Sequence, residues 1–160
     1  MNYQTLSNKY IADNQRKLNI LLASLHIYYQ NLRTFHWKVQ GPNFFELHKQ
    51  FEEMYDNVSE YIDDIAERLL ALQADPITQL SEYLIISELE EVSEELTTQE
   101  MLEKVLSDQE VLIQSLRFLV SFSNQHGDEG TADMLVGMLR EVEKDSWMVR
   151  AYLRKSTISS

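Results

Sequence analysis

The sequence predicts an all-α protein built as a single four-helix bundle, and two observations carry that prediction. The 160 residues include only four Gly and two Pro, too few for a fold with many tight hairpins. Apolar residues recur at intervals of three and four along four long stretches, which is the pattern of amphipathic helices. The length is that of one domain, so we expect residues 1–160 to form a single domain.

The first two helices are expected on either side of a Gly-Pro-Asn break at 41–43. The first runs from about residue 7 to 36, and its apolar stripe contains Leu18, Leu21, Leu22, Leu25, Tyr28, Tyr29 and Leu32. Asn43 and Glu46 have the spacing of a capping box, so the second helix begins there and runs to about Gln73, before an Asp-Pro pair. Its stripe contains Leu47, Phe51, Val58, Ile65, Leu69 and Leu72.

The connection after the second helix is long. Its segment ITQLSEYLII at 77–86 is too short for a bundle helix and too apolar for an exposed linker. We expect a short extra helix there, packed at a subunit interface. An acidic connector, interpreted as a solvated turn, follows it. Thr97 and Glu100 then form a capping box for the third helix, which ends around 125–127.

The third helix carries Leu102, Val105, Leu106, Leu112, Ile113, Leu116, Leu119 and Val120. A fourth helix follows Asp-Glu-Gly at 128–130, closes near Leu153, and carries Leu135, Met138, Leu139, Val142, Trp147 and Met148. Four helices with a long second connection indicate a ferritin-like crossover bundle rather than a simple up-and-down one.

Composition restricts the chemistry and the partners. Without Cys, a metal must be held by His and carboxylate groups, which favours hard or borderline ions such as iron. The net charge of −12 favours cation uptake and opposes binding to a phosphate backbone. The first ten residues lack the pattern of a signal peptide, and no apolar run is long enough to cross a bilayer. We therefore expect a soluble, cytoplasmic protein.

Two pairs of potential metal ligands lie on the second predicted helix. His48 and Glu52 are spaced i,i+4, and so are Asp63 and Glu67. Asp63 follows Glu52 by eleven positions, which at ~1.5 Å per residue separates the pairs by roughly 16 Å, so one metal cannot bind both. Both pairs nevertheless share one stripe, and a two-fold-related antiparallel copy would bring them together. The spacing predicts a site shared between subunits.

Other histidines and carboxylates bear on the same site. His36 closes the first helix, so the hairpin is expected to bring its imidazole near that of His48. Two imidazoles with carboxylates suit Fe(II) and leave positions open for an oxidant. The Glu-x-x-His motif of common ferritin-type bundles is absent, which disfavours a site inside one bundle. Trp37 is either a wall of the site or a packing anchor, and His26 and His126 are interpreted as structural.

These residues in order resemble the Dps family of mini-ferritins. The segment HWKVQGPNFFELHKQFEEMYDNVSEYIDDIAERLLAL is similar to that family's signature: a His-Trp, a second His twelve residues on, and then D-x-x-A-E-R. The resemblance continues through DEGTADML to Trp147-Met148, covering nearly the whole chain. It implies a homododecamer with ferroxidase sites at its two-fold interfaces, formed by His36, His48 and Glu52 of one subunit and Asp63 and Glu67 of its mate.

The resemblance also implies the substrates: Fe(II), oxidised preferably by hydrogen peroxide and stored as ferric mineral. Other divalent metals are alternative occupants of the site. Many family members have Asp where this chain has Glu52, which keeps the carboxylate but lengthens it by one methylene. Asp128, Glu129 and Asp133 correspond by resemblance to an iron-entry pore on a three-fold axis, although acids at a helix start also complement its dipole.

Two other functions remain open. Some family members condense DNA through Lys-rich tails, but the termini here offer few basic residues: Lys9, Arg16, Lys17, Arg150, Arg154 and Lys155. Twelve copies at −12 carry 12 × (−12) = −144, so direct DNA binding is disfavoured. The third hypothesis is a structural shell with an impaired metal site. It predicts correct assembly with negligible iron oxidation.

Overall fold

The computed structural model describes residues 1 and 5–158, the last four of them by their backbone, and it confirms the predicted all-α fold. The side chain of Lys155 lies outside the described residues. The elements are the four long helices α1 (Asn8–Lys38), α2 (Phe44–Ala71), α4 (Thr98–Gln125) and α5 (Glu129–Ile158), and the short α3 (Leu80–Ile86). The short helix lies between α2 and α4, as predicted.

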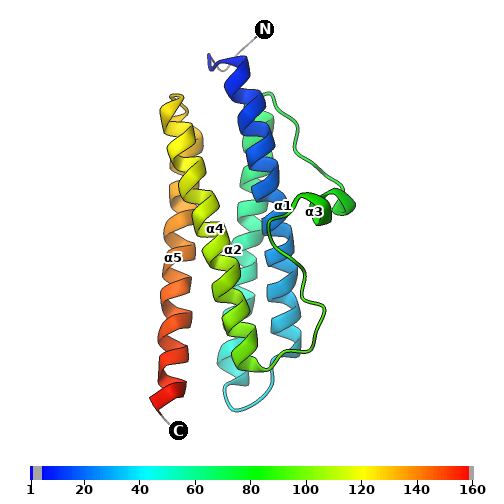
Figure 1. Ribbon diagram of the computed structural model, residues 1–160, viewed down its shortest axis with the longest axis vertical. Helices are drawn as coiled ribbons and strands as arrows, with labels where there is room; N and C mark the ends of the chain where they lie inside the picture. The colour runs from blue at the N-terminus through cyan, green and yellow to red at the C-terminus, as the bar shows by residue number, and fades with distance from the viewer. Residues whose placement is uncertain (2–4, 159–160) are drawn as a thin grey trace.

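Two antiparallel hairpins make up the bundle (Figure 1). In one hairpin α1 packs against α2, and in the other α4 packs against α5. The connection between α2 and α4 returns along the length of the molecule, so these two helices run in the same direction (Figure 1). This is the predicted ferritin-like crossover, and α3 within it packs against α1.

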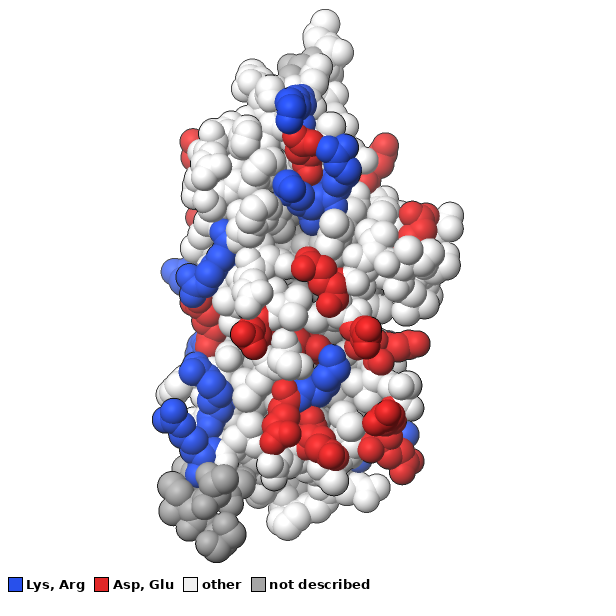
Figure 2. All heavy atoms as spheres, in the orientation of Figure 1, with Lys and Arg blue, Asp and Glu red and all other residues white. Residues whose placement is uncertain are grey.

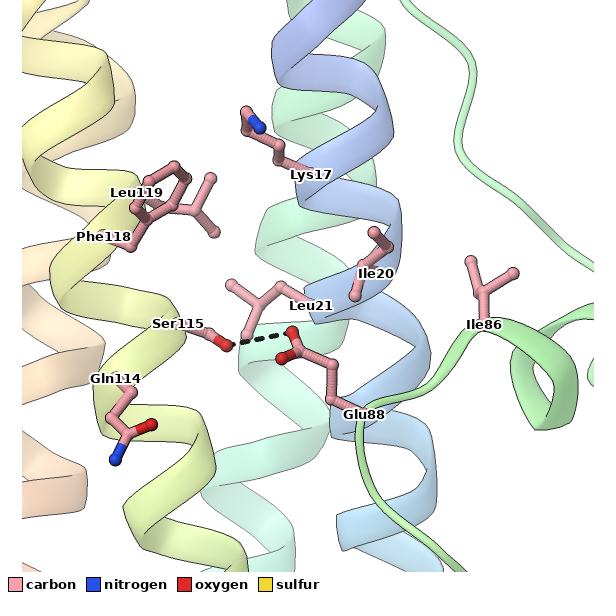
Figure 3. A pocket seen from close by; sticks show the side chains of 9 residues that line it. All are labelled: Lys17, Ile20, Leu21, Ile86, Glu88, Gln114, Ser115, Phe118 and Leu119. Carbon is pink, nitrogen blue, oxygen red and sulfur yellow. Dashed lines mark hydrogen bonds between the residues drawn. The ribbon is translucent and has the colours of Figure 1, made fainter.

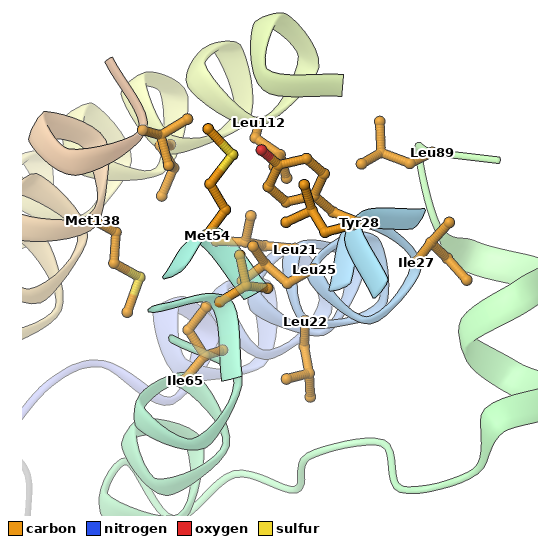
Figure 4. Packing of buried hydrophobic residues seen from close by; sticks show 14 of the residues in the cluster. Leu21, Leu22, Leu25, Ile27, Tyr28, Met54, Ile65, Leu89, Leu112 and Met138 are labelled. Carbon is orange, nitrogen blue, oxygen red and sulfur yellow. The ribbon is translucent and has the colours of Figure 1, made fainter. Parts of the chain in front are cut away.

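The core is filled by the apolar stripes of the four long helices. Figure 4 shows side chains from all of them converging, among them Leu21, Met54, Leu112 and Met138. Every predicted core residue of α2 is buried. On α5 the stripe is buried as far as Val142, but Trp147 is 60% exposed and faces away from the core of the subunit.

The helix starts test the capping predictions. Thr97 and Glu100 form both hydrogen bonds of a capping box, which confirms that prediction. The box predicted at Asn43 and Glu46 is wrong, because the Asn43 side chain makes no cap hydrogen bond and instead donates to the Tyr152 hydroxyl on α5 at 2.5 Å. The start of α2 is thereby tied across the bundle to α5.

The surface of α3 is unusually apolar for a short exposed helix. Leu80 and Ile85 are 72% and 80% exposed, and Leu84 is exposed as well. Exposed apolar side chains gathered on one element are typical of contact surfaces, so packing of α3 at a subunit interface stays a prediction. Among the described residues, no helix combines the length and apolar character needed to cross a membrane.

Candidate metal site at the α1–α2 hairpin

The imidazoles of His36 and His48 are stacked at the hairpin between α1 and α2. Their ring centroids are 3.7 Å apart and their planes differ by 16°. His36 is buried at the end of α1, and His48 is half-buried one turn into α2. The structure thus brings the two predicted ligands together, and we refer to them below as the imidazole pair.

Each imidazole donates to the backbone of the other residue. His36 Nδ1 lies 2.6 Å from the carbonyl oxygen of His48, and His48 Nδ1 lies 2.7 Å from the carbonyl oxygen of His36. Because a carbonyl only accepts, both Nδ1 atoms carry the hydrogen, and in the neutral rings both Nε2 atoms keep a lone pair. Within the described part of the chain neither Nε2 has a hydrogen-bond partner, so neither lone pair is used by the subunit itself.

Aromatic side chains hold the imidazole pair in place. Phe44 stacks on His48 with centroids 5.0 Å apart, and Tyr55 stands edge-on to His36 at 5.3 Å and 89°. The rings are therefore oriented from both sides. A ligand pair fixed before the metal arrives loses little rotamer freedom on binding.

The predicted carboxylates are not gathered around this pair in one subunit. Glu52, Asp63 and Glu67 are all exposed on α2. Asp63 follows His48 by 15 residues, so at ~1.5 Å per residue it lies about 22 Å away along the helix. Among the described residues, no group of three or more His, Asp or Glu side chains is close enough to hold a metal. The five-residue set stays a prediction that requires a second subunit.

Asp128 occupies a different environment from the one predicted for a pore. It is buried, its Oδ1 accepts from Arg68 Nη2 at 2.6 Å, and its Oδ2 accepts from the Tyr10 hydroxyl at 2.8 Å. The backbone N–H and the hydroxyl of Thr131 also donate to it, at 3.0 and 2.6 Å. Asp128 therefore caps α5 and ties it to α1 and α2. Glu129 and Asp133, by contrast, are exposed at the start of α5.

We call this network of Tyr10, Arg68, Asp128 and Thr131 the clasp. Burial alone would raise the pKa of Asp128, but hydrogen bonds from Thr131 and Tyr10 and the charge of Arg68 outweigh it and hold that pKa below its usual value. Gly130 belongs to the same arrangement, because a Cβ there would come within 2.8 Å of Arg68 Nη2.

The sequence contained a signal for the clasp that the family resemblance obscured. Asp128 is followed three residues later by Thr131 at the start of an apolar run, which is the pattern of an N-cap. Its partner Arg68 closes the D-x-x-A-E-R motif. No local pattern indicates that these two side chains, sixty residues apart, meet.

The two remaining histidines are held by aromatic stacking. His26 lies against Tyr83 with centroids 4.1 Å apart, which links α1 to α3, and burial lowers the pKa of His26. His126 stacks on Tyr10 at 4.9 Å, and its Nδ1 donates to the carbonyl of Phe122 at 2.8 Å. These contacts agree with the structural interpretation made from the sequence.

A groove of about 460 Å³ opens between α1, α4 and the end of α3 (Figure 3). Its walls are mostly apolar. Among its polar groups, Ser115 donates to Glu88 at 3.0 Å, and Lys17 lies over the ring of Phe118. It contains no His and a single carboxylate, so it offers no set of metal ligands.

One further carboxylate has an unusual environment. Burial, followed by repulsion from Glu141, raises the pKa of Asp145 on α5 to about 6. Burial and the nearby charges of Asp145 and Glu141 also raise the pKa of Tyr61, on α2. Carboxylates on α2 and α5 thus raise the pKa of Asp145 and that of Tyr61, in addition to the effect of burial.

Comparison with known proteins places the chain among ferritin-like proteins. A family model described as a ferritin-like domain matches residues 15–158, which include every predicted site residue. The chain is 38% identical over 138 residues to DNA protection during starvation protein 2 of Bacillus anthracis, covering 86% of this chain and 94% of that protein. It is 38% identical over 150 residues to the DNA protection during starvation protein of Porphyromonas gingivalis, covering 94% of each.

Solved structures show the same likeness. The Dps protein from Vibrio cholerae O1, described as a member of a broad superfamily of ferritin-like diiron-carboxylate proteins, has a TM-score of 0.91 and 33% identity. That match covers 96% of this chain and 98% of the other. A Dps protein from Bacillus brevis has a TM-score of 0.89 and 34% identity, covering 92% and 99%.

Proposed function

The chain belongs to the Dps family of ferritin-like proteins, and from that premise we propose that it is a ferroxidase and iron-storage mini-ferritin. In this proposal Fe(II) is the substrate, hydrogen peroxide is the preferred oxidant, and a dodecameric shell stores the ferric product. Consuming iron and peroxide together protects against oxidative stress.

The observation that carries the proposal is the imidazole pair. Both rings are held with Nδ1–H donated to a carbonyl, so two Nε2 lone pairs are presented without any rearrangement. The Nδ1 hydrogen bonds join the end of α1 to α2, but they leave both Nε2 atoms unused among the described residues. They are the ligands expected of a site that binds a borderline cation such as Fe(II).

The carboxylates supply the negative charge that the imidazoles lack. Glu52 lies one turn beyond His48, and Asp63 and Glu67 of a two-fold-related subunit would complete the site. Carboxylate oxygens stabilise iron increasingly as it loses an electron, because attraction grows with the ion's charge. The iron therefore remains bound while peroxide oxidises it. Glu52 reaches one methylene farther than Asp, so we expect altered occupancy of the second iron position.

Entry of iron is assigned to Glu129 and Asp133. Both are exposed at the start of α5, and copies around a three-fold axis would add their potentials and concentrate cations. Asp128 is engaged by Arg68 and Tyr10, so its part in this path is to fix the start of α5 rather than to bind iron.

The experiment is stopped-flow absorbance of ferric formation after anaerobic Fe(II) loading and addition of hydrogen peroxide. The test variant is the Asp63→Ala, Glu67→Ala double substitution. The matched control is Glu60→Ala, Asp64→Ala, which removes the same charge from exposed positions of the same helix. Size-exclusion chromatography of both variants checks that they still assemble.

The proposal predicts fast ferric formation in the wild type and the control, and its loss in the test variant. Equally slow formation in all three proteins would contradict it and favour a shell with an impaired metal site.

Several relatives are named for DNA protection, but direct DNA binding has weak support in this chain. Figure 2 shows basic side chains near the upper end and along one edge, with acidic side chains over the centre of the same face. Near the N-terminal end Lys9 and Arg16 both pair with Asp13. We propose that protection works through removal of iron and peroxide. A salt-sensitive gel shift at low ionic strength would instead support DNA binding.

A further inference from the structure

A line of aromatic rings leads away from the imidazole pair. Tyr55 stands edge-on to His36 with centroids 5.3 Å apart. Tyr29, on α1, stands edge-on to Tyr55 at 5.7 Å and 83°. Rings at these separations are in van der Waals contact. The line therefore runs without a gap from a predicted iron ligand to two oxidisable phenols.

Trp37 does not take part in this line, although it follows His36 directly in the sequence. Its side chain is 59% exposed and lies against the guanidinium of Arg33, at 4.7 Å. The same guanidinium lies over Tyr29, at 5.3 Å. Besides its partner His48, the α2 ring that touches His36 is the oxidisable phenol of Tyr55. Phe44, on the other side of the imidazole pair, is not readily oxidised.

We propose that Tyr55 is an electron donor to the iron site and that Tyr29 receives the resulting radical. This rests on the proposed ferroxidase function and adds one step to it. Reduction of hydrogen peroxide to water takes two electrons, which two bound irons supply together. A site holding a single Fe(II) supplies only one, and the second electron would come from Tyr55 through the ring of His36.

The step balances with peroxide as the only oxidant. One Fe(II), one tyrosine, one hydrogen peroxide and one proton give one Fe(III), one tyrosyl radical and two waters. The O–O bond breaks, and the iron and the phenol each lose one electron. The phenol proton and one proton from solvent end in the waters. Without the tyrosine, the same site would release a hydroxyl radical.

The experiment is rapid-freeze EPR spectroscopy of the assembled protein loaded anaerobically with one Fe(II) per site and mixed with one equivalent of hydrogen peroxide. Incorporation of ring-deuterated tyrosine identifies a tyrosyl signal, because its hyperfine splitting collapses. A radical on Trp37 would not respond. Ferric absorbance and a hydroxyl-radical spin trap are measured on the same samples.

Three single variants are compared with the wild type. Tyr55→Phe keeps the ring and its packing but removes the oxidisable hydroxyl. Tyr29→Phe removes the second phenol only. Tyr61→Phe is the control, because Tyr61 lies on the same helix as Tyr55, is also half-buried, and makes no ring contact with the imidazole pair among the described residues.

We call the electron transfer from Tyr55 to the iron site, followed by radical transfer to Tyr29, the relay. It predicts a tyrosyl signal in the wild type and in Tyr61→Phe. In Tyr55→Phe the signal is lost and trapped hydroxyl radical rises. In Tyr29→Phe the signal persists and changes its lineshape, because the radical stays on Tyr55. Normal ferric formation without a tyrosyl signal in the wild type would overturn the relay alone. Absence of ferric product in every protein would overturn the proposed function and the relay with it.

Discussion

The polar side chains at the two ends of α2 differ in how completely they are hydrogen-bonded. Near its C-terminal end, in the clasp, Asp128 accepts hydrogen bonds from Arg68, Tyr10 and Thr131. Near its N-terminal end, the imidazole pair uses its two Nδ1 atoms on backbone carbonyls and leaves both Nε2 atoms without a partner in the described chain.

This difference in hydrogen bonding assigns the clasp to stability and the imidazole pair to function. A buried charge with all its partners holds α1, α2 and α5 together, and removing one partner leaves the others unsatisfied. Polar atoms fixed in orientation but left unpaired contribute little to the subunit and are ready for a ligand. On this view, substitutions at the clasp change stability, and substitutions at the imidazole pair change iron chemistry.

The largest expected effect on stability is at the clasp. Asp128→Ala should lower the free energy of unfolding by about 3–5 kcal/mol, because it leaves the Arg68 charge and the Tyr10 and Thr131 hydroxyls without their acceptor. Urea unfolding at fixed protein concentration measures it. Asp133→Ala, an exposed carboxylate on the same helix, serves as the control. If Asp128→Ala lowered the free energy of unfolding no more than the control does, the clasp would not be what holds these helices together.

The clasp should also make stability depend on pH. The folded-state pKa of Asp128 lies below its unfolded value of about 3.9, so its contribution is complete above that pH and is lost as the pH falls through the folded pKa. The stability gap between wild type and Asp128→Asn should therefore be constant near neutral pH and narrow below about pH 4. Unfolding curves across that range check it, and a gap independent of pH would contradict it.

The pH dependence of stability that Asp145 contributes should have the opposite sign. Its pKa is raised to about 6, so the folded state holds its proton more tightly than the unfolded state does. Asp145→Asn should stabilise the protein at neutral pH by about 1–2 kcal/mol, after allowance for solvent screening of this half-buried group. The gain should shrink as the pH falls through 6. Thermal unfolding at several pH values tests this, and a destabilised variant at neutral pH would reverse the interpretation.

The smallest expected effect on stability is at the imidazole pair. His48→Gln should change the free energy of unfolding by no more than about 1 kcal/mol, because it removes one hydrogen bond and leaves no buried charge. Ferric formation should nevertheless fall sharply. Chemical unfolding measures the change in stability, and stopped-flow absorbance on the same preparation measures the change in ferric formation. A large loss of stability would show that the pair is structural.

Much of the fold was accessible from the sequence because helix periodicity and the capping pattern at Thr97 are local. The failed cap at Asn43 shows the limit, since its amide is drawn to Tyr152, more than one hundred residues away. The approach of His36 to His48 was predictable because a short hairpin joins them. Their mutual hydrogen bonds to backbone carbonyls were not, because ring orientation depends on packing by Phe44 and Tyr55.

Asp128 teaches the same lesson about long-range contacts. The family resemblance implied a pore for it, whereas in the subunit it is buried and bound to Arg68 from another helix. Tyr55 was likewise not singled out in the sequence, where Trp37 stood beside His36. Which aromatic ring touches an imidazole is a property of the packed helices rather than of sequence adjacency.

The central claim is that the iron site is shared between subunits, and mixed assembly tests it most directly. One parent carries His36→Ala with His48→Ala, the other Asp63→Ala with Glu67→Ala, and both are dissociated and reassembled together. With equal mixing, half of the two-fold interfaces are mixed and each has one of its two sites intact, so the account predicts about a quarter of wild-type ferric formation. Mixed shells as inactive as their parents would contradict a shared site.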